Sequence, residues 1–385
     1  MHNRDMNTDT LEEHQAELAF LHRLHAATPR VFATPAIVAL NALVFLAMLA
    51  MGVSVLGGRP DDYLKFGANF GPLTSGGEWW RLVTCTFVHA GILHILLNMW
   101  ALWDCGRLCE RLFGNAWFVV IYLFAGVCGS FASMLWHNEA VSLGASGAVF
   151  GVFGALLAYT FRERGSIPPT MLNRLRISTS IFVTFSLFYG FANSGIDNAA
   201  HLGGLAAGTL TGFIAARPLE AAARVRGHAR RIALAVLITA VALPSAARFA
   251  PDSSLVYKQA LALQKAIDAF AADERRLSAD FEAMAKRARD KNLDEKATLS
   301  ELREKLIPAW NDAVARLSAI ELDARAPMRG DYESLLRYAQ ARRDMTVALA
   351  DFLEAGTPAS RQNFIDKRAA TEAALKDYRE RQTRK

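Results

Sequence analysis

Long apolar runs separated by short charged loops constrain this chain more than any other feature of its sequence. A transmembrane helix needs about 20 mostly apolar residues, and the sequence offers seven candidates. They lie at 33–55, 87–104, 115–136, 144–161, 178–194, 199–216 and 232–249. The first run is too long and starts too late for a cleavable signal peptide. The sequence therefore predicts a polytopic bundle of membrane helices.

Arginines in the short loops predict the orientation of these helices. The loop between the fourth and fifth spans and the loop between the sixth and seventh are rich in them: Arg162, Arg164, Arg174, Arg176, Arg217, Arg224, Arg226, Arg230 and Arg231. Because cytoplasmic loops carry an excess of Lys and Arg, we expect the N-terminus inside and the chain after the seventh span outside. The net charge of +6 is thereby explained by orientation in the lipid bilayer, without nucleic-acid binding.

Charge also divides the chain into parts. More than half of the 43 Lys and Arg and 37 Asp and Glu residues follow residue 250, so we expect an all-α membrane bundle followed by a soluble helical domain. The expected parts are a solvated cytoplasmic tail (1–32), a six-helix core (33–216), a basic loop with a seventh transmembrane helix (217–250) and a charged extracytoplasmic domain (251–385).

The charged domain has helical periodicity. Its first helix is amphipathic, and further helices are expected near 293–322, 331–355 and 358–383, with Pro308 kinking or shortening the second of these. These segments predict a small helical bundle. Its nearly balanced charge argues against a nucleic-acid arm, and the sequence identifies no partner for it.

Polar residues inside the membrane spans are functional candidates, because they are costly there. Four stand out: His94, Asn98, Ser146 and His201. His94 and Asn98 share one helical face, and Ser146 and His201 lie at the starts of the fourth and sixth spans. Since the second, fourth and sixth spans all run from outside to inside, we expect the four side chains at one depth, in the outer third of the bilayer.

Glycines predict how these helices meet. Gly147 and Gly151 form a GxxxG pair in the fourth span, and Gly204, Gly208 and Gly212 repeat the spacing in the sixth. Small residues let helix backbones approach closely. Because His201 shares the glycine face of the sixth span, close packing would bring it near Ser146.

This pairing suits nucleophilic catalysis. A neutral imidazole near pH 7 can take the proton of a serine hydroxyl. Asp197 lies four residues before His201 but is expected in the loop, which favours a Ser-His dyad. Asn98, His94 and the Ser146 backbone N–H could stabilise an oxyanion, and Phe150 could pack on the His201 ring.

These segments resemble the rhomboid family of intramembrane serine proteases over about residues 30–216. "GASGAVFG" (144–151) resembles the GxSG nucleophile motif, and "AHLGGLAAG" (200–208) the histidine motif. "HILLN" (94–98) resembles the HxxxN oxyanion element. "EWWRLVT" (78–84) resembles the Trp-Arg element of the first loop, and "GRLCERLFG" (106–114) the GxxxExxxG turn.

The resemblance implies an endopeptidase without metal or cofactor that cleaves transmembrane segments of other proteins. It implies Ser146 as nucleophile, His201 as general base, and His94 and Asn98 as oxyanion donors. The supporting residues would be Gly144, Gly147, Phe150, Trp80, Arg81 and Gly204. Several bacterial members have Tyr where Phe150 stands, and the seventh span and charged domain are additions to the six-span family core.

Alternatives stay open. A catalytically inactive rhomboid-like protein would bind membrane-protein clients, although Ser146 and His201 are both intact. A transporter would need polar residues that continue inward, and a zinc protease using His89, His94 and His201 would lack an HExxH motif. His89 and His137 are expected in loops, solvated or capping a helix. Cys105 and Cys109 are attributed to packing.

Overall fold

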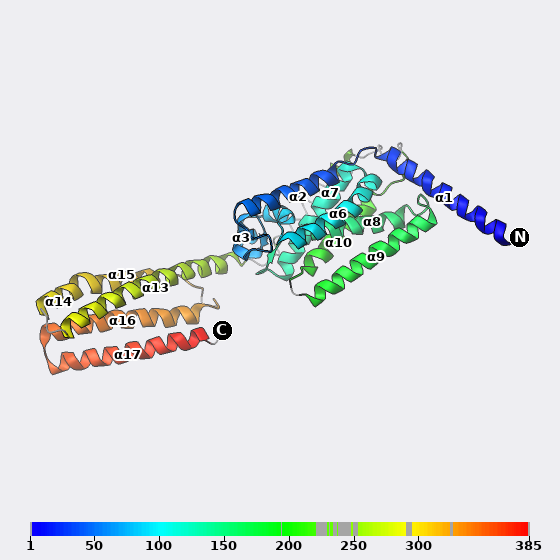
Figure 1. The fold of residues 1–385 in the computed structure, drawn as a ribbon. Coiled ribbons are helices and arrows are strands. Elements are labelled where there is room, and N and C mark those ends of the chain that lie inside the picture. Colours follow the sequence, from blue (N-terminus) through cyan, green and yellow to red (C-terminus); the bar gives the residue numbers. More distant parts are fainter. Residues whose placement is uncertain are drawn as a thin grey trace. The chain divides into compact units, whose positions relative to one another are not determined.

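The computed structural model describes residues 2–193, 195–220, 229–230, 232–233, 237, 248, 253–289, 295–323 and 326–383. The chain forms two compact units, residues 1–254 and 255–385. Helices dominate both units (Figure 1), which confirms the expected all-α class. The seventh span expected at 232–249 lies, apart from isolated positions, outside the described residues.

The first unit is a bundle of long helices. These are α1 (His2–Ala27), α2 (Ala33–Ala50), α6 (Ile92–Phe113), α7 (Asn115–Trp136), α8 (Ser146–Arg162), α9 (Pro169–Ala192) and α10 (Asn198–Ala215). Three of them, α2, α7 and α9, are long and apolar enough to cross a membrane. α8 is a shorter apolar helix.

The span expected at 87–104 is wrong at both ends. The chain bends by 95° between the segment Arg81–Phe87 and α6, and the two together qualify as one broken span. Gly91 has φ +87° and caps α6, a conformation that ends a helix and favours glycine. α9 also starts earlier than the expected residue 178, because Pro169 occupies its first turn.

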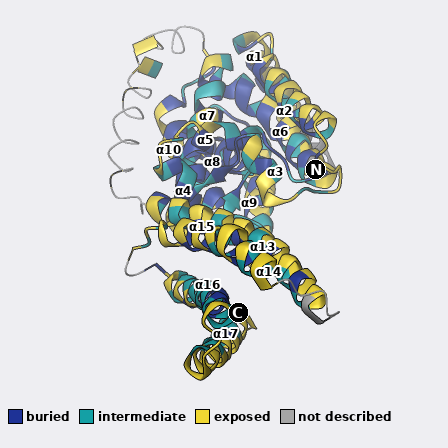
Figure 2. Cartoon of the chain, turned by 90° about the vertical axis from the view of Figure 1, so that its left-hand side faces the viewer, coloured by how far each residue is buried: buried dark blue, intermediate teal, exposed yellow. Residues whose placement is uncertain are grey.

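α8 lies at the centre of this unit, where buried residues gather (Figure 2). It packs against α10 at backbone contact. A Cβ atom built on Gly204 would lie 2.0 Å from the Gly147 carbonyl oxygen, and one built on Gly208 would lie 2.0 Å from that of Gly151. Only glycine permits this approach, so the spacing seen in the sequence sets the separation of the two helices.

A buried carboxylate accepts the free backbone N–H groups at the start of α2. Glu110, near the end of α6, accepts hydrogen bonds from the backbone N–H groups of Phe32 (2.9 Å), Ala33 (2.7 Å) and Thr34 (2.8 Å) and from the Thr34 hydroxyl (2.7 Å). The first N–H groups of a helix have no intrahelical partners, and a negative charge is favourable at this end. Glu110 therefore ties α2 to α6.

The loop between α2 and α6 holds the short elements α3 (Pro60–Lys65), β1 (Asn69–Phe70), α4 (Gly71–Ser75), α5 (Arg81–Thr84) and the 3₁₀ turn η1 (Cys85–Phe87). Buried Arg81 donates to the carbonyls of Leu64 (2.8 Å) and Ala68 (2.9 Å). β1 pairs antiparallel with β2 (Val141–Ser142), which shortly precedes Ser146. The loop is thus joined to the segment that leads into Ser146.

The segment 1–32, expected as a solvated tail, is mostly helical. It forms α1, whose described side chains are largely exposed, while its Phe20 and Leu24 are buried in the core of the first unit. These two residues are four apart and so share one helical face. His14, His22 and His25 are exposed.

The second unit is a helical bundle, as expected for the charged C-terminal part. Its helices are α13 (Ser254–Arg289), α14 (Glu295–Glu301), the π-helical turn η2 (Leu302–Leu306), α15 (Ile307–Ser318), α16 (Arg329–Ala355) and α17 (Pro358–Thr383). The helix expected at 293–322 is divided into α14, η2 and α15, and Pro308 lies in the first turn of α15. A proline is tolerated in the first turn of a helix because its missing N–H has no intrahelical partner there.

Residues spaced by seven carry the core contacts of α13. Leu263, Phe270, Leu277 and Met284 are buried, and the last three pack in one cluster with Trp310. The opposite face of α13 is charged, so this unit has the amphipathic construction of a soluble bundle.

We predict that Gly208→Val weakens the first unit by separating α8 and α10. The added side chain would overlap the Gly151 backbone, so the free energy of unfolding should fall by about 1–3 kcal/mol. Denaturant unfolding in detergent micelles measures it. Gly165→Val is the control, because a Cβ there meets no atom within 4 Å. Equal unfolding midpoints for the two variants would contradict the close approach.

Candidate active site

The structure brings Ser146 and His201 together. Ser146 is the first residue of α8 and His201 lies in the first turn of α10. Ser146 Oγ is 2.9 Å from His201 Nε2, which is hydrogen-bonding distance. If the hydroxyl donates, the neutral ring carries its proton on Nδ1, because only one ring nitrogen is then a donor.

The His201 ring is held by stacking. Phe150 lies one turn after Ser146 and stacks on the imidazole at 4.2 Å between centroids, with 6° between the planes. His201 Nδ1 is buried and bonds no atom of the described chain. Ring contact and burial, rather than a second hydrogen bond, therefore set the ring plane.

The Asp197 carboxylate does not bond to the His201 ring, although the His201 backbone N–H donates to the Asp197 carbonyl at 3.1 Å. This carboxylate accepts the Ala200 backbone N–H (2.9 Å) as the N-cap of α10 and the Ser142 hydroxyl (2.6 Å). It thereby links the start of the helix that carries His201 to β2, just before Ser146. The sequence left its role open, and the structure gives it a structural one.

His94 lies against the segment that leads to Ser146. Gly144 has φ +117°, and a Cβ there would be 2.7 Å from His94 Nε2. The Ala90 backbone N–H donates to His94 Nδ1 (3.3 Å). A neutral His94 therefore carries its proton on Nε2, the nitrogen that faces Gly144.

Asn98 is buried one turn after His94. Its amide nitrogen donates to the His94 carbonyl at 2.9 Å. An amide has two N–H donors, so this bond leaves one for another acceptor. The position is compatible with an oxyanion donor, and the bond orients the amide along α6.

Trp80, Arg81 and the helix glycines Gly147 and Gly204 contribute through the backbone and loop structure around the site. Arg81 is bonded within the first loop, and its guanidinium lies 4.6 Å from the Trp80 ring centroid. Gly147 and Gly204 form the backbone contact between α8 and α10. These four residues therefore hold the backbone that positions the site.

His89 was missed by the sequence analysis. It was expected to be solvated or to cap a helix, yet its side chain is completely buried, with Nε2 accepting the Ala145 backbone N–H at 3.3 Å. The available signal was a histidine in an apolar stretch, five residues before His94. His137, by contrast, is exposed at the end of α7.

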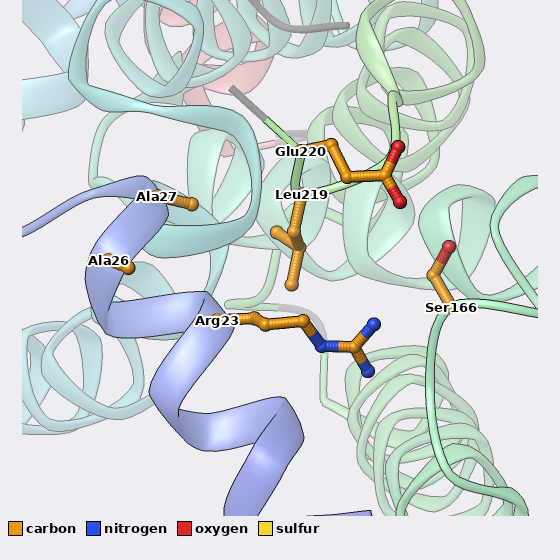
Figure 3. Close-up of a pocket in the computed structure, with 6 residues that line it drawn as sticks. All are labelled: Arg23, Ala26, Ala27, Ser166, Leu219 and Glu220. Carbon is orange, nitrogen blue, oxygen red and sulfur yellow. The ribbon is translucent and has the colours of Figure 1, made fainter. Parts of the chain in front are cut away.

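A pocket of about 180 Å³ lies at the other end of the bundle (Figure 3). Its lining is Arg23, Ala26, Ala27, Ser166, Leu219 and Glu220. Ser166 follows the end of α8 and Leu219 follows the end of α10, whereas Ser146 and His201 lie at the starts of those helices. This pocket is therefore separate from the Ser146–His201 pair.

Known proteins resemble the region that contains the pair. A family model of the Rhomboid domain matches residues 76–218. Rhomboid protease GluP of Bacillus subtilis is 37% identical over 206 residues, 54% of this chain and 38% of GluP. RHOMBOID-like protein 7 of Arabidopsis thaliana is 35% identical over 166 residues, 42% of this chain and 50% of that protein.

Coverage differs among the relatives. The match to YdcA, another rhomboid protein of Bacillus subtilis, is 33% identical over 155 residues, 40% of this chain and 75% of YdcA. The matched segment spans half or less of GluP and of the Arabidopsis relative. The second unit, 255–385, lies outside the family match.

We predict that Asp197→Ala destabilises the protein while Asp197→Asn does not. Alanine removes the N-cap and the bond to Ser142, which should lower the free energy of unfolding by about 1–2 kcal/mol. Asparagine accepts the Ala200 N–H equally well. Thermal unfolding in detergent compares the two, with Ser142→Ala isolating the second bond. Wild-type stability of Asp197→Ala would refute this role.

Proposed function

Because the chain belongs to the rhomboid family, we propose that it is an intramembrane serine endopeptidase that cleaves transmembrane segments of other membrane proteins. The observation that carries this proposal is the 2.9 Å contact between Ser146 Oγ and His201 Nε2. A serine hydroxyl becomes nucleophilic when an adjacent base removes its proton. The likeness to a relative named rhomboid protease supports hydrolysis as the reaction class.

In the first step His201 Nε2 takes the Ser146 proton while Oγ attacks the scissile carbonyl carbon. The carbonyl π electrons move to oxygen, and the resulting oxyanion accepts hydrogen bonds from Asn98, from His94 Nε2–H and from the Ser146 backbone N–H. Such prearranged donors are a large source of rate acceleration. The Ala90 N–H donates to His94 Nδ1, so a neutral His94 carries its proton on Nε2, which supports its role as an oxyanion donor.

In the second step the imidazolium of His201 gives its proton to the amide nitrogen. The C–N bond breaks, one peptide product leaves, and the other remains as an ester on Ser146. Water then attacks this ester with His201 as the base, and the ester bond breaks to return the Ser146 hydroxyl. The Phe150 stack supports one ring orientation throughout, which favours both proton transfers.

The supporting residues stabilise the helices and the loop that hold the reacting groups. Gly147 and Gly204 keep α8 and α10 at contact, and Gly144 leaves room for His94. Arg81 and Trp80 stabilise the first loop. In this scheme none of the five exchanges a proton with the substrate.

The chain is an integral membrane protein, and we place it in a bacterial cytoplasmic membrane. The arginine-rich loops support an N-terminus inside. The proposed parts are the N-terminal segment 1–32, the catalytic core 33–216, the loop and seventh helix 217–250, and an extracytoplasmic helical domain 251–385. Substrates would reach Ser146 from the surrounding bilayer.

We predict that Ser146→Ala and His201→Ala each abolish cleavage of a model transmembrane substrate, lowering kcat by roughly 10⁴-fold or more. Ser146→Ala should also lose covalent labelling by a serine-directed fluorophosphonate. Both variants should stay folded in detergent. Ser133→Ala is the matched control, because it removes a buried serine of α7 and should label like the wild type.

Two outcomes would count against the protease. Full, metal-dependent cleavage by Ser146→Ala would overturn the nucleophile. A folded wild type that stays unlabelled, under conditions that label a known rhomboid protease, would favour an inactive client-binding protein.

We predict that a tag attached after Lys385 is digested by protease added to intact cells with a permeabilised outer membrane. An extracytoplasmic second unit exposes the tag, whereas a cytoplasmic one shields it. A tag at the N-terminus is the control and should survive until the inner membrane is lysed. The reverse pattern would invert the topology.

A further inference from the structure

His89 is a completely buried imidazole to which the reaction scheme assigns no part. It lies in the short segment between η1 and α6, where the broken span bends. A buried polar group is normally retained with its hydrogen bonds satisfied. Its partners therefore show what it does.

The first partner is the backbone just before the nucleophile. His89 Nε2 lies 3.3 Å from the Ala145 backbone nitrogen, whose N–H donates to it. Nδ1 faces the Phe87 carbonyl at the longer distance of 3.4 Å. The ring is thus placed as a neutral imidazole with its proton on Nδ1.

The second partner of His89 is His94, the residue proposed as an oxyanion donor. The rings of His89 and His94 meet edge to face, with centroids 5.1 Å apart and 64° between planes. Ala90, the next residue, donates its N–H to His94 Nδ1. His89 therefore holds the Ala145 peptide and contacts the His94 ring, and Ala90 sets the tautomer of His94.

A further bond ties the same two segments. The Gly144 backbone N–H donates to the Cys85 carbonyl at 2.9 Å. The N–H groups of Gly144 and Ala145 are both used by the 85–89 segment, and the next one along the chain is that of Ser146. Holding both preceding peptides determines where the Ser146 N–H is aimed.

We infer that His89 is a positioning residue for the oxyanion site: its Nε2 accepts the Ala145 N–H and its ring supports His94, which aligns the Ser146 N–H and the His94 Nε2–H on one point. This inference rests on the proposed protease function. It states that the reaction rate depends on the hydrogen-bond acceptor Nε2 of His89 and not only on the volume of its side chain. Small displacements of aligned groups cost large factors in rate.

The test compares His89→Gln with His89→Met. The two side chains are close in length and volume, but only Gln carries an amide oxygen that accepts the Ala145 N–H. Fluorophosphonate labelling of Ser146 and kcat for a transmembrane substrate should fall at least about tenfold in His89→Met. His89→Gln should recover most of both rates. KM should stay near the wild-type value in both, because a completely buried His89 does not touch the substrate.

Controls separate this inference from the function it rests on. His137→Met removes an exposed histidine and should label like the wild type, and Ser146→Ala should not label. Failure of the wild type to label or cleave would overturn the protease itself. An active wild type with equal rates in His89→Gln and His89→Met, or a loss in His89→Met that appears only in KM or only as a lower unfolding temperature, would overturn the positioning role.

Discussion

Backbone contact between α8 and α10 is the constraint on which the rest of the first unit depends. Gly204 and Gly208 lie so close to the carbonyls of Gly147 and Gly151 that no Cβ fits between them. The separation of the two helix backbones that carry Ser146 and His201 is thereby set by peptide groups, which have no rotamers. The side chains of Ser146 and His201 then need only the correct rotamers, which the Phe150 ring supports for His201.

Hydrogen bonds hold the loops and helix ends around the contact between α8 and α10. Non-helical backbone is tolerated at membrane depth only where its polar groups find partners in the protein. Glu110 supplies them for the start of α2, Arg81 for the first loop, and Asp197 for the start of α10. Each is a charged residue used for several bonds at once, and each joins segments that are separate along the chain or caps a helix end.

Much of this arrangement could be predicted from the sequence, because helix packing leaves a periodic signal. The spacing of glycines in the fourth and sixth spans predicted which helices meet, and the polar residues pointed to Ser146 and His201. Non-local bonds leave no such signal. The hydrogen-bond partner of buried His89 is Ala145, 56 positions later, and the bend before α6 contains Gly91 with a positive φ. The N-terminal helix was missed because, among its residues from 11 onwards, whose burial is described, Phe20 and Leu24 are the ones buried in the core.

The length of α8 has a consequence for solvent. Its 17 residues reach only about 26 Å at 1.5 Å per residue, less than the roughly 30 Å of a bilayer's hydrocarbon core. In the proposed orientation Arg162 lies at the polar interface, so the shortfall falls at Ser146. In the proposed protease the hydroxyl would lie below the membrane surface, and each hydrolysis would have to bring a water molecule down to it through the protein interior.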